Sequence, residues 1–348
     1  MAKKLRVFVG LSGGVDSSVC AALLKEQGYE VVGVYMKNWS QDLPGFACPW
    51  KEDYYDAKRV AVQLGIKFQM FDFEKEYRDK VVDYMLEAFE SGITPNPDIM
   101  CNQEIKFKLF LDTALDKGAD MIATGHYANT AEGQLLISAD QNKDQTYFLY
   151  RVSRDALNKT LFPLGKYKKP EVRKLAKKYG LITATKKESM GICFVGKVGI
   201  KDFLQQFVKT KEGDILDQKN KIIGRHDGAI FYTIGQRHGL DVGGGLPYYV
   251  TGKDMSKNEV YVTSDIDDAK LWRKKFELTS LHWINQPPKN DQKLFVRTRH
   301  RAPLAECIIS VTNQKAVVVL TAKQRALTAG QSAVFYDENR VVGGGIII

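Results

Sequence analysis

Short apolar runs alternate with helix-like patterns through the first half of the chain, and this alternation limits the possible folds more than any other feature. The apolar runs predict strands at Leu5–Leu11, Glu30–Met36, Lys67–Phe73 and Asp120–Thr124. Helices are predicted between them at Val15–Gln27, Asp53–Leu64, Glu76–Ser91 and Ile105–Lys117. Strand and helix in regular succession indicate an α/β domain with a parallel sheet and helices on both faces. A ligand is then expected beyond the carboxyl ends of the strands.

The pattern changes near residue 200. Before that point, the sequence predicts an appended strand at Leu135–Ser138 and a helix at Lys169–Tyr179. After a connecting helix at Val198–Lys209, short strands are expected at Lys221–Arg225, Ala229–Thr233, Tyr248–Thr251 and Val260–Thr263. A further group predicts a small barrel, with strands at Phe276–Leu281, Lys293–Arg299, Ala305–Val311, Ala316–Leu320 and Ser332–Tyr336. We therefore expect three domains, at 1–197, 198–268 and 269–348.

The charge balance suits a polyanionic partner. Lys and Arg number 51 against 41 Asp and Glu, which gives a net charge of +10. A nucleic acid would explain this excess through counterion release, and a generally basic, solvated surface would explain it equally well. The five cysteines are odd in number and widely spaced, which does not indicate an extracellular disulfide framework. We expect a cytoplasmic protein with no signal peptide and no membrane association.

A glycine-rich loop, Gly10-Leu11-Ser12-Gly13-Gly14-Val15-Asp16-Ser17, lies between the first predicted strand and the first predicted helix. Its glycines let the backbone turn sharply and approach a ligand closely. Its short polar side chains stand beside the amides of a helix N-terminus, where an anion is favoured. The loop lacks the Lys-Ser/Thr ending of a Walker loop and is not the dinucleotide fingerprint. A capped turn without a ligand is the alternative.

Two cysteines stand in unusual surroundings. Cys101 follows the proline-rich turn Thr94–Asp98 and enters a predicted helix, with Lys106 nearby. A thiol in that position is expected to have a lowered pKa. Cys193 lies between Gly191 and Gly196. The alternative for any one cysteine is a small buried hydrophobe, which suits two others better, Cys20 and Cys307. A metal site is not expected, because there is no Cys-x-x-Cys pair or Cys/His cluster.

The glycine-rich loop resembles the pyrophosphate (PP) loop of ATP pyrophosphatases, which cleave ATP between the α and β phosphates. The chain as a whole resembles the tRNA-specific 2-thiouridylases. The resemblance is carried by Ser12–Ser17, Gly33–Asn38, Pro95–Phe107, Ala123–Tyr127, Lys143–Leu149, Gly191–Phe194, Gly224–Gly228 and Tyr232–Arg237. It implies a PP-loop domain of the adenine nucleotide alpha hydrolase type, followed by two β-rich domains, the last a barrel.

The resemblance also implies the reaction. Gly10–Ser17 would bind ATP, Met36 and Gly125 would line the adenosine pocket, and Mg²⁺ would arrive with ATP. The wobble uridine of the tRNAs for Lys, Glu and Gln would be adenylylated at O2 and then thiolated. A sulfur-relay protein would load Cys193 with a persulfide. Cys101 would attack it and form a Cys101–Cys193 disulfide, which requires the two Cα atoms to come within about 7 Å.

The same resemblance places tRNA contacts in both the first and the last domain. Asn96, Pro97 and Asp98 would meet the target base, with Asp98 as an acid/base; Asp98 could instead cap the helix that holds Cys101. The other expected contacts are His126, Lys143, Asp144, Gln145, Arg299, His300 and Gln331. The basic run Arg297–Arg301 fits phosphate binding, or a solvated strand face.

Two positions depart from the family pattern. Met190 stands where a polar residue is common, which weakens any polar role there. Ala128 and Asn129 stand where a basic residue often follows, which weakens one expected tRNA contact. Four alternatives remain: another ATP pyrophosphatase, a glutamine-hydrolysing synthetase with an amidotransferase partner, a 4-thiouridine synthase with an added N-terminal RNA-binding region, or a non-catalytic tRNA-binding or ATP-sensing module. The cysteine pair favours the thiouridylase over a glutamine-hydrolysing synthetase and over a non-catalytic module. A sequence that starts directly at its first predicted strand does not match the added region expected of a 4-thiouridine synthase.

Overall fold

A computed structural model describes residues 4–44, 47–187, 199–240, 242–243, 245 and 247–348. Its first unit contains a five-stranded sheet in the order β3-β2-β1-β4-β7, and all neighbouring strands are parallel. The strands are β1 (Arg6–Gly10), β2 (Glu30–Lys37), β3 (Lys67–Asp72), β4 (Met121–Ala123) and β7 (Thr160–Leu161). The predicted parallel sheet is confirmed, with β7 as an additional edge strand.

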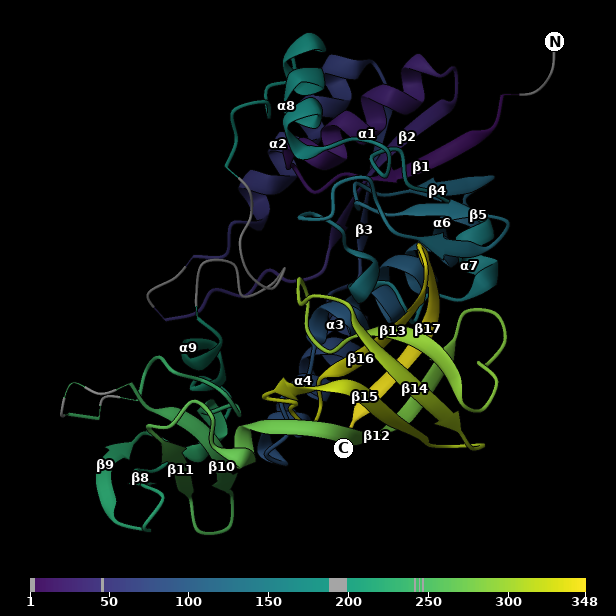
Figure 1. Ribbon diagram of the computed structural model, residues 1–348. Coiled ribbons are helices and arrows are strands. Elements are labelled where there is room, and N and C mark those ends of the chain that lie inside the picture. Colours follow the sequence, from purple (N-terminus) through teal and green to yellow (C-terminus); the bar gives the residue numbers. More distant parts are fainter. Residues whose placement is uncertain (1–3, 45–46, 188–198, 241, 244, 246) are drawn as a thin grey trace.

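Helices cover both faces of this sheet (Figure 1). The α-helices of the first unit are α1 (Val15–Glu26), α2 (Trp50–Leu64), α3 (Glu74–Tyr77), α4 (Asp83–Glu90), α5 (Pro97–Met100), α6 (Phe110–Asp116), α7 (Arg154–Asn158) and α8 (Lys169–Lys178). Helix α9 (Ile200–Leu204) lies away from this sheet (Figure 1). Val7 and Val9 of β1 belong to the apolar cluster that includes α1 and α2, whereas Phe8 belongs to the opposite cluster with α6. Alternate residues of one strand thus fill two different cores.

Two π-helices interrupt the helical segments that the sequence predicts as continuous. They are η1 (Arg78–Val82) and η2 (Cys101–Leu109), and η2 runs directly into α6. A π-helix holds one extra residue per turn relative to its neighbours, and such segments often occur at functional sites. Apolar periodicity predicts a helix here but does not distinguish its hydrogen-bond pattern.

The central module is a four-stranded sheet in the order β10-β11-β8-β9. Its strands are β8 (Gly213–Leu216), β9 (Ile222–His226), β10 (Tyr249–Asp254) and β11 (Glu259–Thr263). The predicted strand at 229–233 is wrong, because Ala229–Phe231 forms a 3₁₀ turn, η4, that follows Gly228 at a φ of 149°. The helix predicted at 198–209 is present but shorter. Ile200–Leu204 is α-helical, Gln206 and Phe207 close i→i+3 turns, and residue 198 lies outside the described residues.

The predicted C-terminal barrel is confirmed; it is closed and antiparallel, with six strands where the sequence predicts five. It is formed by β12 (Trp272–Trp283), β13 (Gln292–Arg297), β14 (Ala305–Val311), β15 (Ala316–Arg325), β16 (Ser332–Asp337) and β17 (Arg340–Ile347), and β12 pairs with both β15 and β17. The strand expected at 135–138 exists as β6 (Gln134–Leu136). It forms a hairpin with β5 (Asn129–Ala131) and extends the barrel through β17.

One apolar core runs through all three units. Its buried members include Phe110 from the first unit, Ile230 from the central module and Tyr336 from the barrel. Figure 1 shows α3 and α4 beside the barrel, where the first unit meets the other two. Such a shared core fixes the units relative to one another far more firmly than a flexible linker would. Among the described residues, no helix combines the length and apolar character needed to span a membrane.

Candidate functional site

The glycine-rich loop connects β1 to α1 and folds tightly onto itself. Gly14 is the N-cap of α1, and no side chain caps the helix. The Ser17 hydroxyl accepts a hydrogen bond from the Ser12 amide at 3.2 Å and donates one to the Gly14 carbonyl at 3.2 Å. Gly13 has a φ of 73°, and a Cβ there would lie 2.4 Å from the Asp53 carbonyl oxygen. Only glycine fits at this position.

The two residues expected at the adenosine pocket lie against this loop. A Cβ on Gly10 would be 3.0 Å from Cε of Met36. A Cβ on Gly125 would be 2.8 Å from the Ser17 nitrogen. Segments from β1, β2 and the end of β4 therefore meet at the carboxyl edge of the sheet, as the fold class requires.

Lys169 is a residue of this site that sequence reasoning missed. Its buried ammonium lies 2.8 Å from both carboxylate oxygens of Asp16, and the Tyr127 hydroxyl donates to Asp16 at 3.0 Å. Lys169 is also the first residue of α8. A cation is unfavourable beside a helix N-terminus. A lysine at the start of a predicted helix could therefore have indicated that its side chain pairs with a carboxylate elsewhere in the chain.

The loop offers little for an independent metal site. Within the ranges that the structure describes, no group of three or more His, Cys, Asp or Glu side chains is placed to hold a metal ion. Asp16 is the carboxylate of the loop itself, and Lys169 already contacts it. The glycine-rich loop therefore fits a cation such as Mg²⁺, whose remaining ligands would be water and the phosphate oxygens of a bound nucleotide.

The proline-rich turn leads into α5 and then into η2. Asn96 is the N-cap of α5 and makes no capping hydrogen bond through its side chain; Pro97 and Asp98 are the first two helical residues. The interpretation of Asp98 as the N-cap is therefore wrong. Asp98 nevertheless stands in the first turn, where a carboxylate is stabilised by the helix dipole.

Cys101 begins η2 and is only 1% exposed. Cys20 and Cys307 are also buried, and burial raises the pKa of both thiols, that of Cys307 to about 12. These two fit the interpretation as small buried hydrophobes. Cys193 lies in 188–198, outside the described residues, so the expected approach of Cys101 and Cys193 stays a prediction.

His126 connects the glycine-rich loop to the cysteine helix. It follows Gly125 directly, and its ring centroid lies 5.6 Å from that of Phe107 in η2. Its Nδ1 is 2.8 Å from the Thr124 hydroxyl. Burial, with a further contribution from Lys106, holds the pKa of His126 well below its usual range. The ring is therefore neutral near pH 7.

The loop that contains Lys143, Asp144 and Gln145 is held in place by hydrogen bonds to other parts of the protein. Asp144 is buried and accepts hydrogen bonds from Thr146 at 2.6 Å and Arg297 at 3.2 Å. The Gln145 side chain accepts a hydrogen bond from the Tyr127 amide at 3.0 Å. Asp144 and Gln145 thus fix the position of Lys143. Arg297 is 14% exposed and ion-paired, so the solvated-face alternative is wrong for that residue.

The last expected contacts lie where the barrel meets the other units. The His300 ring packs on Phe148 with centroids 4.5 Å apart. Arg299 donates to the Ala326 carbonyl at 2.8 Å. Gln331 reaches the proline-rich turn and donates from Nε2 to the Thr94 carbonyl at 2.9 Å. The structure thus brings Gln331 to the cysteine-bearing segment.

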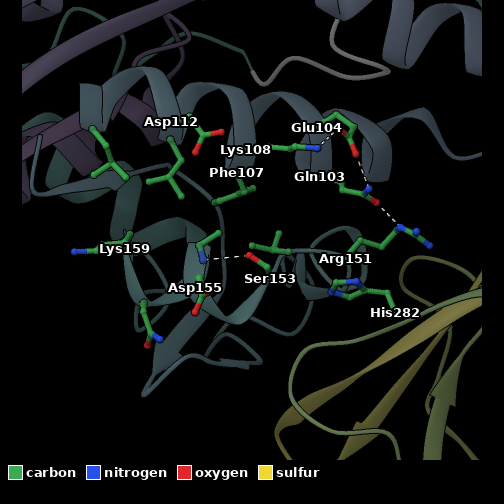
Figure 2. A pocket seen from close by; sticks show the side chains of 15 residues that line it. Gln103, Glu104, Phe107, Lys108, Asp112, Arg151, Ser153, Asp155, Lys159 and His282 are labelled. Atoms are coloured by element: carbon green, nitrogen blue, oxygen red, sulfur yellow. Dashed lines mark hydrogen bonds and ion pairs between the residues drawn. The ribbon is translucent and has the colours of Figure 1, made fainter. Parts of the chain in front are cut away.

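A separate cleft of about 750 Å³ lies on the outer face of η2 and α6. Figure 2 shows its polar rim, which includes Glu104, Lys108, Arg151 and His282, and the link from Gln103 to Arg151. Apolar side chains of Phe107, Leu111 and Val152 also line it. None of the expected site residues that the structure describes lines this cleft, so it is distinct from the glycine-rich loop.

Acid should destabilise the fold partly through His300. Burial, together with Arg301, Arg297 and Lys143, lowers the pKa of His300 to about 4, whereas an unfolded histidine titrates near 6.5. As pH falls below 6.5 the unfolded chain takes up this proton first, so stability is lost between pH 6.5 and pH 4. We expect His300→Asn to reduce the stability difference between pH 7.5 and pH 5 by about 1 kcal/mol, allowing for solvent screening.

Urea unfolding of wild type and variant at the two pH values measures this difference. His238→Asn serves as the control for loss of an exposed histidine. An equal pH dependence in wild type and His300→Asn would show that His300 is not held neutral by the fold.

The chain matches three family models in succession. Residues 5–197 match the tRNA methyl transferase HUP domain, residues 201–264 the tRNA methyl transferase PRC-barrel domain, and residues 273–347 the aminomethyltransferase β-barrel domain. The tRNA-specific 2-thiouridylase MnmA of Streptococcus thermophilus is 45% identical over 99% of this chain and 95% of its own length. That of Streptococcus agalactiae is 47% identical, with the same coverage.

Among solved structures, a 4-thiouridine synthetase–RNA complex with bound ATP is much less similar. It gives a TM-score of 0.38 at 18% identity and covers 58% of this chain and 50% of that one. A similarity at this level carries no functional argument.

Proposed function

Because the chain belongs to the tRNA-specific 2-thiouridylases, we propose that it replaces the 2-oxygen of the wobble uridine with sulfur in the tRNAs for Lys, Glu and Gln. The reaction consumes ATP and gives 2-thiouridine, AMP and pyrophosphate. One structural observation supports it above the others. Gly125 packs on the glycine-rich loop while His126, the next residue, packs on the helix that begins with Cys101. The proposed nucleotide site and the proposed sulfur site would thereby be linked by two consecutive residues.

The glycine-rich loop would hold the phosphates of ATP. Its amides at the start of α1 and its serine hydroxyls are donors for phosphate oxygens. Lys169 supplies a cation beside the loop, where it pairs with Asp16. Mg²⁺ would neutralise phosphate charge when bound. Where Gly13 and Gly125 lack a side chain, backbone atoms of Asp53 and Ser17 pack closely, so these glycines allow the loop to be held tightly in one position.

Activation turns a poor leaving group into a good one. O2 of the uridine attacks the α-phosphorus of ATP, the bond to the β-phosphate oxygen breaks, and pyrophosphate leaves. Asn96, Pro97 and Asp98 would hold the flipped base for this step, with Asp98 accepting or returning the proton. Lys143, Arg299 and His300 would bind the tRNA around it.

Sulfur then replaces the activated oxygen. A relay protein would leave a persulfide on Cys193. Its terminal sulfur attacks C2 either while still bound, or as free sulfide after Cys101 has attacked Sγ of Cys193 and formed the disulfide. AMP departs with the former 2-oxygen. In the bound route, Cys101 attacks Sγ of Cys193, the sulfur–sulfur bond breaks, and a Cys101–Cys193 disulfide forms as 2-thiouridine is released. A cellular thiol must reduce this disulfide before the next turnover. Cytoplasmic conditions, where thiols stay reduced, suit this step.

Nucleotide products test the activation step directly. We expect AMP and pyrophosphate to accumulate when the protein is mixed with ATP, Mg²⁺ and unmodified tRNA, and not when tRNA is omitted. The reason is that O2 of the uridine is the nucleophile, so cleavage waits for the base. Anion-exchange chromatography of radiolabelled ATP measures the products. Accumulation of ADP, or AMP formation at equal rates without tRNA, would contradict adenylylation of the uridine.

A further inference from the structure

The proline-rich turn is bonded to the barrel through its own backbone. The Thr94 amide donates to the Ala329 carbonyl at 3.2 Å. In return, Gln331 donates from Nε2 to the Thr94 carbonyl at 2.9 Å and to the Pro95 carbonyl at 3.4 Å. Both backbone polar groups of Thr94 are thus satisfied by one barrel turn, more than 230 residues away in sequence.

The contact is close as well as hydrogen-bonded. Gly330 has a φ of 90°, and a Cβ there would lie 2.1 Å from Cγ2 of Ile93 and 2.7 Å from the Thr94 carbonyl oxygen. Any side chain at 330 would therefore push the barrel turn away from Thr94. From the central module, the Thr233 hydroxyl lies 3.1 Å from that of Thr94. Three units converge on a single residue.

A second connection joins the barrel to the cysteine helix. Gln103 of η2 accepts a hydrogen bond from Arg151 (Figure 2). Arg151 also donates to the Ser280 carbonyl in β12 at 2.8 Å. The segment from Thr94 to Gln103, which carries Asp98 and Cys101, is consequently bonded to the barrel at both ends. Its interior contains Pro95 and Pro97, which restrict the backbone between the two connections.

We propose that the barrel turn Ala329–Gln331 positions the catalytic segment, and that Gln331 is a positioning residue for the chemical step. This inference rests on the proposed function. The two N–H groups of the Gln331 carboxamide hold the Thr94–Pro95 backbone, and the rigid turn transmits that position to Asp98 and Cys101. The barrel thereby contributes to catalysis itself, beyond any contribution to tRNA affinity. A displacement of about 1 Å at reacting groups can lower a rate by about 100-fold.

Two variants separate positioning from tRNA contact. Gln331→Met keeps the length of the side chain and removes both donors. Gly330→Ala removes no side chain that could touch tRNA, yet displaces the turn. We expect each to lower kcat for 2-thiouridine formation by about tenfold or more at saturating tRNA and ATP, with the Kd for tRNA changed less than about threefold. Gln314→Met, at an exposed glutamine of the barrel, is the matched control and should keep both values.

The inference would be overturned if Gln331→Met raised the Kd for tRNA tenfold and left kcat unchanged while Gly330→Ala had no effect on either value. If these variants fail to fold, as judged by Tm, Gln331→Lys and Gln331→Leu replace them. Lysine retains N–H donors for the Thr94 carbonyl and leucine does not, so only leucine should lower kcat; equal kcat for the two variants would also overturn the inference. A wild-type protein that forms no 2-thiouridine would instead refute the proposed function.

Discussion

Cys101→Ser should lower the rate of 2-thiouridine formation at least about 100-fold and leave tRNA affinity within about threefold. Serine is nearly isosteric with cysteine, so the packing of this 1% exposed side chain in the core should survive the change. The hydroxyl cannot attack a persulfide or form a disulfide, which removes the step that releases product. Single-turnover thiolation assays and filter binding with the same tRNA measure the two quantities.

Cys48→Ser is the matched control, because Cys48 is a half-buried cysteine outside the proline-rich turn. It should retain wild-type thiolation. A normal yield from Cys101→Ser would remove Cys101 from the relay, whereas equal losses in both variants would point to general damage by the substitution.

Gly125→Ala should lower tRNA-dependent AMP formation by about 100-fold. The added Cβ would lie 2.8 Å from the Ser17 nitrogen and 2.9 Å from the Asp16 carbonyl carbon, both of which are backbone atoms. The glycine-rich loop would have to move away from its position beside Met36 and Gly10. An α-phosphorus held about 1 Å from its correct place reacts slowly even when ATP still binds.

Initial rates of AMP release across a range of ATP concentrations measure this effect. Gly252→Ala is the control, since a Cβ there makes only an ordinary contact of 3.8 Å with Tyr261. Undiminished AMP formation in Gly125→Ala would place the nucleotide elsewhere and remove the glycine-rich loop from the account.

The parallel sheet and the barrel could be predicted because each rests on a repeated pattern. Val7, Phe8 and Val9 are continuously apolar since both faces of β1 are covered. Strand β17 was missed because Gly343, Gly344 and Gly345 indicate a turn. These glycines serve close packing instead: a Cβ on Gly344 would lie 2.4 Å from the Ala333 carbonyl oxygen. The low strand propensity of glycine was thus overridden by the pairing of β17 with its neighbours in the barrel.

The candidate site could be predicted only in part. The glycines of the loop lie between an apolar run and a helix-like pattern, so the position of the loop at the sheet edge could be predicted from the sequence. The contact of Lys169 with Asp16 joins residues 153 apart, and no local pattern reports such a pairing. The bonds from Gln331 to the proline-rich turn depend in the same way on how the three units pack. Cys193 and the loop around it remain predictions from sequence.

Nucleoside mass spectrometry directly tests whether the protein thiolates the wobble uridine of tRNA. Unmodified glutamate tRNA is incubated with the protein, ATP, Mg²⁺ and a persulfide donor that loads Cys193, then digested to nucleosides. We expect one oxygen atom to be exchanged for sulfur at the wobble uridine. This exchange should not occur without ATP or with the Cys101→Ser variant. ATP turnover to AMP without any thiolated uridine would contradict this expectation, and would leave an ATP pyrophosphatase that acts on a different acceptor.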